Sequence, residues 1–227
     1  MSLSGARASY VGPGLDLAPH ETAAAVVAIG LEEAFSLALP ADASPELRWT
    51  ASIPSNTRHH LIARGSMVFV YLDALSDDHR RMREIDLAEG RRRLVARGVD
   101  AVIQMEVDEI CASLGVPPRE PPDPRIARAI RILDARPQDF RRVADLASLA
   151  GLSPSRFQAL FSRATGMPFR RYRLWRRMAV VMRSVQAGAS LTDAAFEAGF
   201  SGSAHLSATF RDMFGLPPST VRALTVS

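Results

Sequence analysis

One pattern occurs twice in the C-terminal half of this chain. Residues 143–168 read VADLASLAGLSPSRFQALFSRATGMP, and residues 191–217 read LTDAAFEAGFSGSAHLSATFRDMFGLP. At an offset of 48 and then 49 residues, the copies share Asp, Ala, Gly, Ser, Phe and Pro at corresponding places. Each copy predicts a short helix, a glycine turn and a second helix, the arrangement with which helix-turn-helix proteins enter DNA grooves. A single copy is weak evidence, because any small helical hairpin shares it, whereas two copies at a fixed distance favour a nucleic-acid reader.

The first copy contains the signals that begin and end such helices. Gly151 stands where positive φ ends the first helix, Ser153 can cap the second, and Pro154 occupies its first position. Phe157 and Phe161 follow at helical spacing and are expected to pack inward. Arg and Gln on the outer side are suited to guanine and adenine edges. The residues expected to face DNA are Ser153, Ser155, Arg156, Gln158, Ala159, Ser162 and Arg163.

The second copy repeats this layout with smaller outward side chains. Gly199 turns the chain, and Leu206 and Phe210 are expected to face inward. Because the outer face has few long polar side chains, we expect weaker base discrimination there and more backbone contact. The residues expected to face DNA are Ser203, Ala204, His205, Ser207, Ala208 and Arg211.

A long helix is expected to join the two readers, from Pro168 to about Gln186. Roughly 19 residues at about 1.5 Å each span about 28 Å. With the packed ends, this brings the readers near one DNA repeat of about 34 Å, so one chain can reach two successive major grooves. Its expected core stripe is Trp175, Met178, Val181 and Met182. Its arginines suited to phosphate contact are Arg170, Arg171, Arg173, Arg176, Arg177 and Arg183, of which Arg170, Arg173, Arg176 and Arg177 are placed in the DNA-binding site.

The charge is divided between the halves of the chain. Residues 1–118 hold 11 Arg against 16 Asp and Glu, a net charge of −5, whereas residues 119–227 hold 17 Arg against 8, a net charge of +9. A basic half beside an acidic half is typical of a protein of which only one part meets phosphate.

The pattern predicts an α+β protein with two domains and a linker. Five prolines between positions 117 and 124 exclude a helix or central strand there, so we place a proline-rich linker at 117–122. Residues 123–227 are expected to form the all-α DNA-binding domain. Residues 1–116 are expected to form a sensor or dimerisation domain, β-rich over 10–75. A helical hairpin is expected over 77–114, capped by Ser76 and broken at Gly98. The predicted strands are 24–29, 35–39, 47–53 and 67–72.

The C-terminal half resembles the AraC/XylS family of bacterial transcriptional regulators. The resemblance covers residues 123–224 and is carried by LASLAGLSPSRFQALFSRATGMPFRRYRLWRRM and LTDAAFEAGFSGSAHLSATFRDMFGLPPSTVR, with a closing G-x-x-P-x-x-x-R pattern on Gly215, Pro218 and Arg222. Ala159 and Ala208 stand where family members often have a long polar residue. The resemblance places base-facing positions at Ser155, Arg156, Gln158, Ala159, Ser203, Ala204, Ser207 and Ala208.

The N-terminal half more loosely resembles a shortened form of the cupin-like sensor barrel found in this family. The similar features are His20, the I-P-x-x-x-x-H segment ending at His59, and the Val-Tyr-Leu-Asp run around Tyr71. The resemblance implies a small-molecule effector near His20, His59 and Tyr71. It also implies a homodimer formed through the helical hairpin, and RNA polymerase as a partner if the protein is an activator.

Other readings of the N-terminal half remain open from the residues alone. A folded dimerisation module without a ligand is one. For the whole chain, the alanines of the second copy leave open an interaction protein with degenerate DNA binding. A cupin-type metalloenzyme fused to a DNA-binding domain is a third. Against a metal site, His59 and His60 are adjacent and point to opposite faces of a strand. We therefore expect no metal site.

Catalytic and membrane functions have little support in the sequence. The chain has no phosphate-cradling glycine loop and no G-x-S-x-G, and Cys111 lies among apolar residues, as a buried structural cysteine does. We expect no catalytic residues and no cofactor. No apolar run reaches 18 residues, the first residues lack signal-peptide features, and one cysteine forms no intrachain disulfide. These features predict a cytoplasmic protein without a membrane partner.

Overall fold

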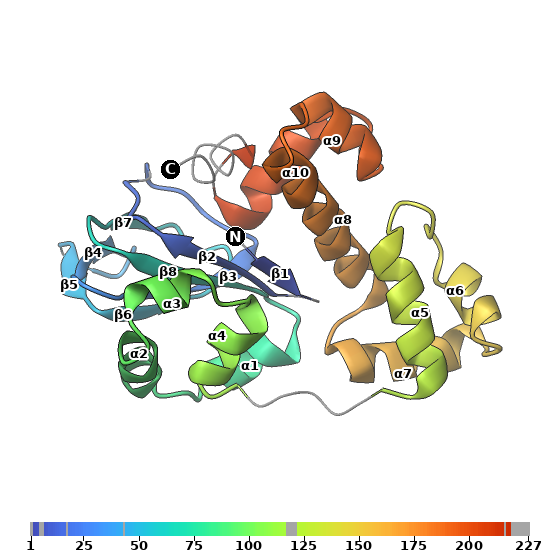
Figure 1. Ribbon diagram of the computed structural model, residues 1–227, viewed down its shortest axis with the longest axis horizontal. Helices are drawn as coiled ribbons and strands as arrows, with labels where there is room; N and C mark the ends of the chain where they lie inside the picture. Colours follow the sequence, from blue (N-terminus) through green and yellow to red (C-terminus); the bar gives the residue numbers. More distant parts are fainter. Residues whose placement is uncertain are drawn as a thin grey trace.

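The computed structural model describes residues 2–4, 7–16, 18–42, 44–116, 122–215 and 217–218. Strands and short helices make up the N-terminal half, and helices alone make up the C-terminal half (Figure 1), so the predicted α+β class is confirmed. Most of the predicted linker and the predicted Arg222 position lie outside the described residues.

Two antiparallel sheets form the β-part. The larger has the order β1 (Ser2–Ser4), β2 (Arg7–Gly12), β8 (Met67–Asp73), β3 (Ala24–Gly30), β6 (Thr50–Ile53), and the smaller has the order β5 (Glu46–Arg48), β4 (Phe35–Ala38), β7 (His60–Ile62). The single strand predicted over 47–53 is wrong, because the chain leaves one sheet and enters the other at Trp49. The sequence did not predict β1, β2 and β7, which are short or carry polar residues and glycine.

The central strands of the larger sheet are buried on both faces. Along β8, Phe69 and Tyr71 belong to one apolar core and Val68 and Val70 to another, as the two-residue period of a strand requires. β3 alternates in the same way. One face of the sheet therefore looks towards the smaller sheet and the C-terminal helices, and the other looks towards the hairpin helices.

Four short helices cover that second face, below the sheet in Figure 1. They are α1 (Asp77–Met82), α2 (Leu87–Val95), α3 (Val99–Ile103) and α4 (Val107–Ser113). Ser76 caps α1 as predicted, and the chain breaks at Gly98 as predicted. The two long hairpin helices are wrong, because Asp86 and Glu106 act as additional N-caps and divide each arm in two.

The C-terminal half has six helices within the described residues. They are α5 (Pro124–Ala135), α6 (Val143–Leu149), α7 (Pro154–Thr165), α8 (Phe169–Gln186), α9 (Leu191–Glu197) and α10 (Ser203–Phe214). The predicted inward residues Phe157, Phe161, Trp175, Leu206 and Phe210 are fully buried. No helix in the described part of the chain combines the length and the apolar character needed to cross a membrane.

The two halves share one core. The ring of Tyr71 in β8 meets that of Phe214 at the end of α10, with ring centroids 5.3 Å apart, and Trp175 of α8 packs on Phe214 at 5.7 Å. The Ala23 amide donates to the Asp212 carbonyl oxygen at 2.6 Å. Gly215 approaches His20 so closely that a Cβ atom would lie 2.1 Å from the imidazole ring, and its φ of +75° also favours glycine. The end of α10 thus packs directly against the β-part, at Tyr71 of β8 and at the segment from His20 to Ala23.

Candidate nucleic-acid interface

The two repeated segments form helix-turn-helix units of similar geometry. Gly151 and Gly199 both adopt positive φ, of 64° and 73°, and turn the chain between the two helices of each unit. Ser153 caps α7 by accepting from the Arg156 amide, as predicted. We call α6–α7 the first reader and α9–α10 the second reader.

The structure leaves most of the predicted base-facing residues at the surface. Among the predicted base-facing residues of the first reader, Ser162 alone is half-buried. Among those of the second reader, Ser203 and Ser207 are half-buried. The ring of His205 packs on Phe200 at 5.3 Å, and its Nδ1 lies 3.0 Å from Ser201 Oγ. His205 therefore has a structural partner beside the turn. The exposed members of the set are Ser153, Ser155, Arg156, Gln158, Ala159, Arg163, Ala204, His205, Ala208 and Arg211.

A basic groove of about 710 Å³ lies between the first reader and α8. Two of its arginines, Arg141 and Arg142, precede α6 and were not predicted, although the Arg-Arg pair directly before a helix-turn-helix was visible in the sequence. The first helix of such a unit crosses the DNA backbone, so its N-terminal end is placed to meet phosphate. The residues that line the groove are Arg141, Arg142, Val143, Gln158, Pro168, Phe169, Arg170, Arg173, Leu174 and Arg177.

The arginines of this groove repel one another. Burial, followed by the charges of Arg173 and Arg141, lowers the pKa of Arg177 to about 10. Burial and the charge of Arg141 also lower the pKa of Arg173. No ion pair is recorded for these three side chains within the described ranges. The groove therefore holds positive charge that a phosphate would neutralise.

Several arginines suited to phosphate contact have intramolecular partners that the sequence did not predict, among them Arg171, which pairs with Asp73 at 2.6 Å. Arg177 donates to the Ala198 and Gly199 carbonyl oxygens at 2.7 Å and stacks on Phe200, and Arg173 donates to the Pro137 carbonyl oxygen at 2.7 Å. Arg176 Nε lies 3.0 Å from Asp134 Oδ1, an ion pair without hydrogen-bond geometry. The last three arginines join the second reader, α5 and the segment after α5 to α8. Arg173 and Arg177 bind neutral carbonyls, so their charge still contributes to the groove.

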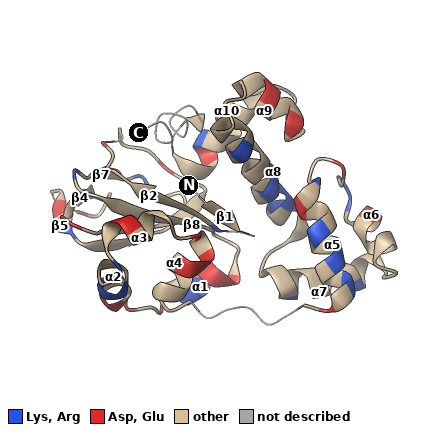
Figure 2. Cartoon of the chain, in the orientation of Figure 1, with Lys and Arg blue, Asp and Glu red and all other residues tan. Residues whose placement is uncertain are grey.

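The two readers differ in charge. Residues 141–166 contain four Arg and one Asp, whereas residues 189–215 contain one Arg and three Asp or Glu. Figure 2 shows basic residues along α5, α7 and α8 and acidic residues on α9. The electrostatic attraction for DNA is therefore concentrated around the first reader and α8.

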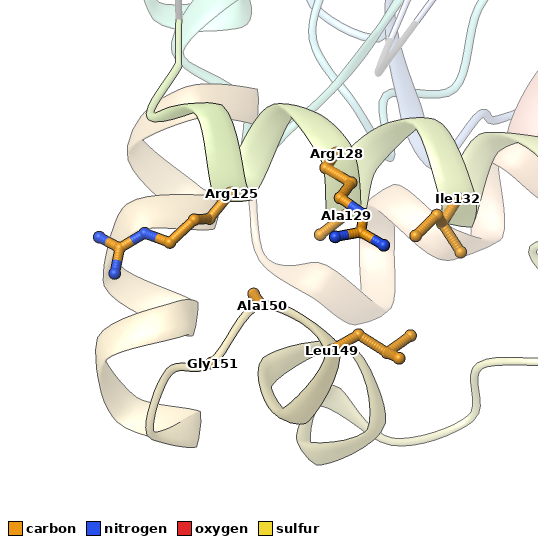
Figure 3. A pocket seen from close by; sticks show the side chains of 7 residues that line it. All are labelled: Arg125, Arg128, Ala129, Ile132, Leu149, Ala150 and Gly151. Carbon is orange, nitrogen blue, oxygen red and sulfur yellow. The ribbon is translucent and has the colours of Figure 1, made fainter.

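A second hollow, of about 230 Å³, lies behind the first reader between α5 and the turn after α6 (Figure 3). Arg128 extends over it, while Ile132 and the 55%-exposed Leu149 form apolar walls. Its volume is below the range of about 300–1,000 Å³ that is typical of small-molecule sites.

The residues predicted to bind an effector do come together in the β-part. The rings of His20 and His59 lie 4.4 Å apart, and both residues line a cavity with Tyr71. His59 and Tyr71 are buried, and burial raises the pKa of Tyr71. The cavity measures only about 20 Å³, which is room for about one water molecule.

Buried His59 predicts a measurable pH dependence of stability. Burial lowers its pKa below the ordinary value of 6.5, against the hydrogen bond to the Thr57 carbonyl oxygen, and the nearby His20 lowers it further. The unfolded chain then binds more protons than the folded chain near pH 6, so stability falls as the pH drops through 6.5. We expect His59→Gln to reduce the loss of stability between pH 7 and pH 5, measured by urea unfolding. An unchanged slope would contradict the buried, neutral His59.

Comparisons with known proteins agree with this geometry. A helix-turn-helix domain family model matches residues 146–223. The transcriptional activator RhrA of Rhizobium meliloti is 30% identical over 116 residues, which cover 49% of this chain and 37% of RhrA. A crystal structure of an AraC-type transcriptional regulator from Chromobacterium violaceum is 25% identical, with a TM-score of 0.43, and covers 46% of this chain and 94% of that chain.

The whole fold also has a counterpart. ToxT from Vibrio cholerae O395 covers 99% of this chain and 100% of its own, with a TM-score of 0.53 and 11% identity. That likeness concerns the fold, including the β-part in front of the helices. The chain thus contains a helix-turn-helix domain that is similar to part of these transcriptional regulators, and it spans less than half of the length of the curated relatives it matches.

Proposed function

We propose that this protein is a sequence-specific transcriptional regulator in which the first reader supplies most of the base recognition and the affinity. The basic groove carries this proposal, because its arginines Arg141, Arg173 and Arg177 have no ion pair within the described ranges and the exposed Gln158 lines the same groove. The exposed Arg156 lies two residues earlier on α7. Duplex DNA fits both features, since phosphates meet the groove while Arg and Gln reach base edges. The acidic second reader then adds backbone contact in the next major groove.

The domain division supports regulation from the N-terminal half. We propose residues 1–116 as the regulatory domain and residues 123–227 as the DNA-binding domain. One structure of ToxT, with a TM-score of 0.50 and 12% identity, contains an unsaturated fatty acid. An effector of comparable size would have to displace side chains near His20 and His59, because the cavity there holds about one water molecule. We also propose that the protein self-associates through α1–α4 and that it is located in the cytoplasm. If it is an activator, we propose RNA polymerase as its partner.

The first test of this function is selection from random duplexes with the purified full-length protein. Fluorescence anisotropy on the selected duplex would follow, over a series of salt concentrations. We expect a motif with two half-sites about ten base pairs apart, and affinity that falls steeply with salt. A single half-site would assign base reading to the first reader alone. The selection is repeated with the fragment of residues 119–227. If neither the full-length protein nor this fragment enriches any sequence, the proposal is refuted.

Arg156→Ala is expected to relax base preference at one position of the selected motif. The side chain is exposed on α7 and can form a bidentate contact with guanine. We expect a loss of about 1–3 kcal/mol on the selected duplex and little change on random duplex. Arg97→Ala, which removes an exposed arginine of the N-terminal half, is the matched control. Equal losses on both duplexes would show that Arg156 binds backbone.

Arg142→Ala is expected to weaken all duplexes alike. This arginine lines the basic groove at the start of α6 and has no base-facing position. Loss of one phosphate contact should reduce the slope of log affinity against log salt by about 0.9. The comparison is anisotropy on selected and random duplexes at several salt concentrations. A selective loss on the selected duplex would overturn the assignment to backbone.

A second candidate function, protein interaction through the second reader, rests on α9. Phe196 is 66% exposed there, between the exposed carboxylates of Asp193 and Glu197. An exposed aromatic residue with acidic neighbours fits a partner with a basic, apolar surface better than it fits DNA. Self-association without affinity for any duplex would favour this function, whereas a Phe196→Ser variant that loses DNA affinity would count against it.

A further inference from the structure

A buried carboxylate joins the β-part to the long helix between the readers. The side chain of Asp73, the last residue of β8, is 0% exposed. Its Oδ2 accepts a hydrogen bond from Trp175 Nε1 at 2.8 Å and another from Arg171 Nε at 2.8 Å, while Arg171 Nη2 lies 2.6 Å away. Arg171 and Trp175 are four residues apart and lie on one face of α8. One oxygen of the sheet thus binds two donors of the DNA-binding half.

The other oxygen of Asp73 has a local partner. Oδ1 accepts from the Leu75 amide at 3.0 Å, and the Asp73 carbonyl accepts from the Ser76 amide and hydroxyl. These bonds shape the turn into α1. The two carboxylate oxygens therefore have separate roles, one within the β-part and one across the contact between the halves.

The strand period explains why Asp73 faces α8. Phe69 and Tyr71 precede it by four and two residues and point to the same face of the sheet. On that face Tyr71 meets Phe214, and Phe214 meets Trp175. The carboxylate and the aromatic rings therefore form one contact between β8, α8 and the end of α10.

We propose that Asp73 is a positioning residue for DNA recognition. By binding Arg171 and Trp175, it fixes the connecting helix, and with it both readers, against the regulatory sheet. A charge with no exposed surface is costly unless it is paired, and Arg171 and Trp175 pair with it only in the docked arrangement, so loss of these partners leaves an unpaired buried charge that favours separated halves. The inference rests on the proposed function for its biological meaning, but docking can be measured without DNA.

Asp73→Asn separates the two roles of this residue. The amide oxygen can still accept from the Leu75 amide, but an NH₂ group then replaces Oδ2 and faces two donors. The turn into α1 is kept, and the contact with α8 is lost. Arg171→Met removes the contact from the other side, and Arg171→Lys keeps a cation there. Asp100→Asn, at an exposed position of α3, is the matched control.

Two intrinsic probes report on the two halves. With Trp49 replaced by Phe, Trp175 is the only tryptophan and reports on the DNA-binding half. Cys111 is the only cysteine and is buried on α4 in the core that this helix shares with the larger sheet, so pulsed thiol modification reports on the N-terminal half. Urea unfolding of the full chain is followed with both probes, and coincident midpoints indicate a single cooperative unit.

We expect coincident midpoints for the Trp49→Phe parent, Asp100→Asn and Arg171→Lys. Asp73→Asn and Arg171→Met should give separate unfolding midpoints for the two probes. Without urea, Cys111 should be modified roughly a hundredfold faster in these variants than in the parent, because a buried pair has been lost. If both midpoints move together in these variants, Asp73 is only a stabilising residue and the proposal is wrong. If Asp73→Asn does not fold, Arg171→Met decides, because that side chain is 31% exposed. Separate midpoints in these variants, with a parent that binds no duplex, would leave docking standing and refute the proposed function, whereas coincident midpoints in the variants with a parent that binds duplex would refute docking and leave the function standing.

Discussion

Phe214→Ala is expected to destabilise the protein by about 3–5 kcal/mol, the range for a large buried aromatic residue. Phe214 is fully buried and contacts the rings of Tyr71, Trp175 and Phe210. Alanine would leave a cavity where the β-part, α8 and α10 meet, so the lost packing affects both halves. For a chain of this size the melting temperature should fall by roughly 6–20 °C, measured by circular dichroism.

Phe196→Ala is the matched control for this prediction. It deletes the same ring from the neighbouring α9, but Phe196 is 66% exposed and no aromatic contact to it is recorded in the described part of the chain. Its expected effect on stability is within about 0.5 kcal/mol. Similar losses for the two variants would mean that the end of α10 does not pack against the β-part in solution.

Arg7→Met is expected to cost a similar amount, about 3–5 kcal/mol, through charge rather than volume. Arg7 of β2 binds the buried Asp78 of α1 through two hydrogen bonds, of 2.8 and 3.0 Å, and Asp108 of α4 at 2.8 Å. Burial alone would lower the pKa of Arg7, but the hydrogen bond to Asp78, together with nearby charges that include those of Asp78 and Asp108, raises that pKa. Methionine keeps the side-chain length and removes the cation that faces a fully buried carboxylate.

The control for Arg7 is another arginine that binds a carboxylate. Arg92 contacts Glu89 within α2, but its side chain is 66% exposed, so Arg92→Met should change stability by less than about 1 kcal/mol. The double variant Arg7→Met with Asp78→Leu should recover part of the loss, since the buried carboxylate is then removed as well. The free energy of unfolding is measured with urea for the unsubstituted protein, Arg7→Met, Arg92→Met and the double variant. No recovery in the double variant would show that Arg7 acts by packing.

The C-terminal half could be predicted closely because its signals are local. Glycine turns, helix caps and apolar spacing lie within a few residues of the elements they define, and the repeat supplied each signal twice. The helices α7, α8 and α10 therefore begin and end near the predicted residues. The exposed positions of Arg156 and Gln158 follow from the same spacing.

What the sequence did not predict depends on contacts between distant segments. The pairing of β5 and β6 in different sheets, and the partners of Arg173, Arg176 and Arg177, are set by tertiary packing. An arginine-rich helix looks the same in sequence whether its side chains bind phosphate or a carbonyl of the same chain. Asp73 is a similar case, because the sequence indicates only a polar residue at the end of a strand. Its partner Trp175 is 102 residues away in the sequence, and only the folded structure brings the two together.

The single core shared by the two halves limits the modularity of this regulator. A chimera that joins residues 122–227 to another regulatory domain would transplant Arg171, Trp175 and Phe214 without Asp73 and Tyr71, and would expose an aromatic surface with no counterpart. A chimera that exchanges DNA specificity between relatives should therefore keep all the residues of this packed surface together. A junction placed at the proline-rich linker would divide them. Substitutions at Asp73, Tyr71 and Phe214 would have to be transferred together with any grafted helix.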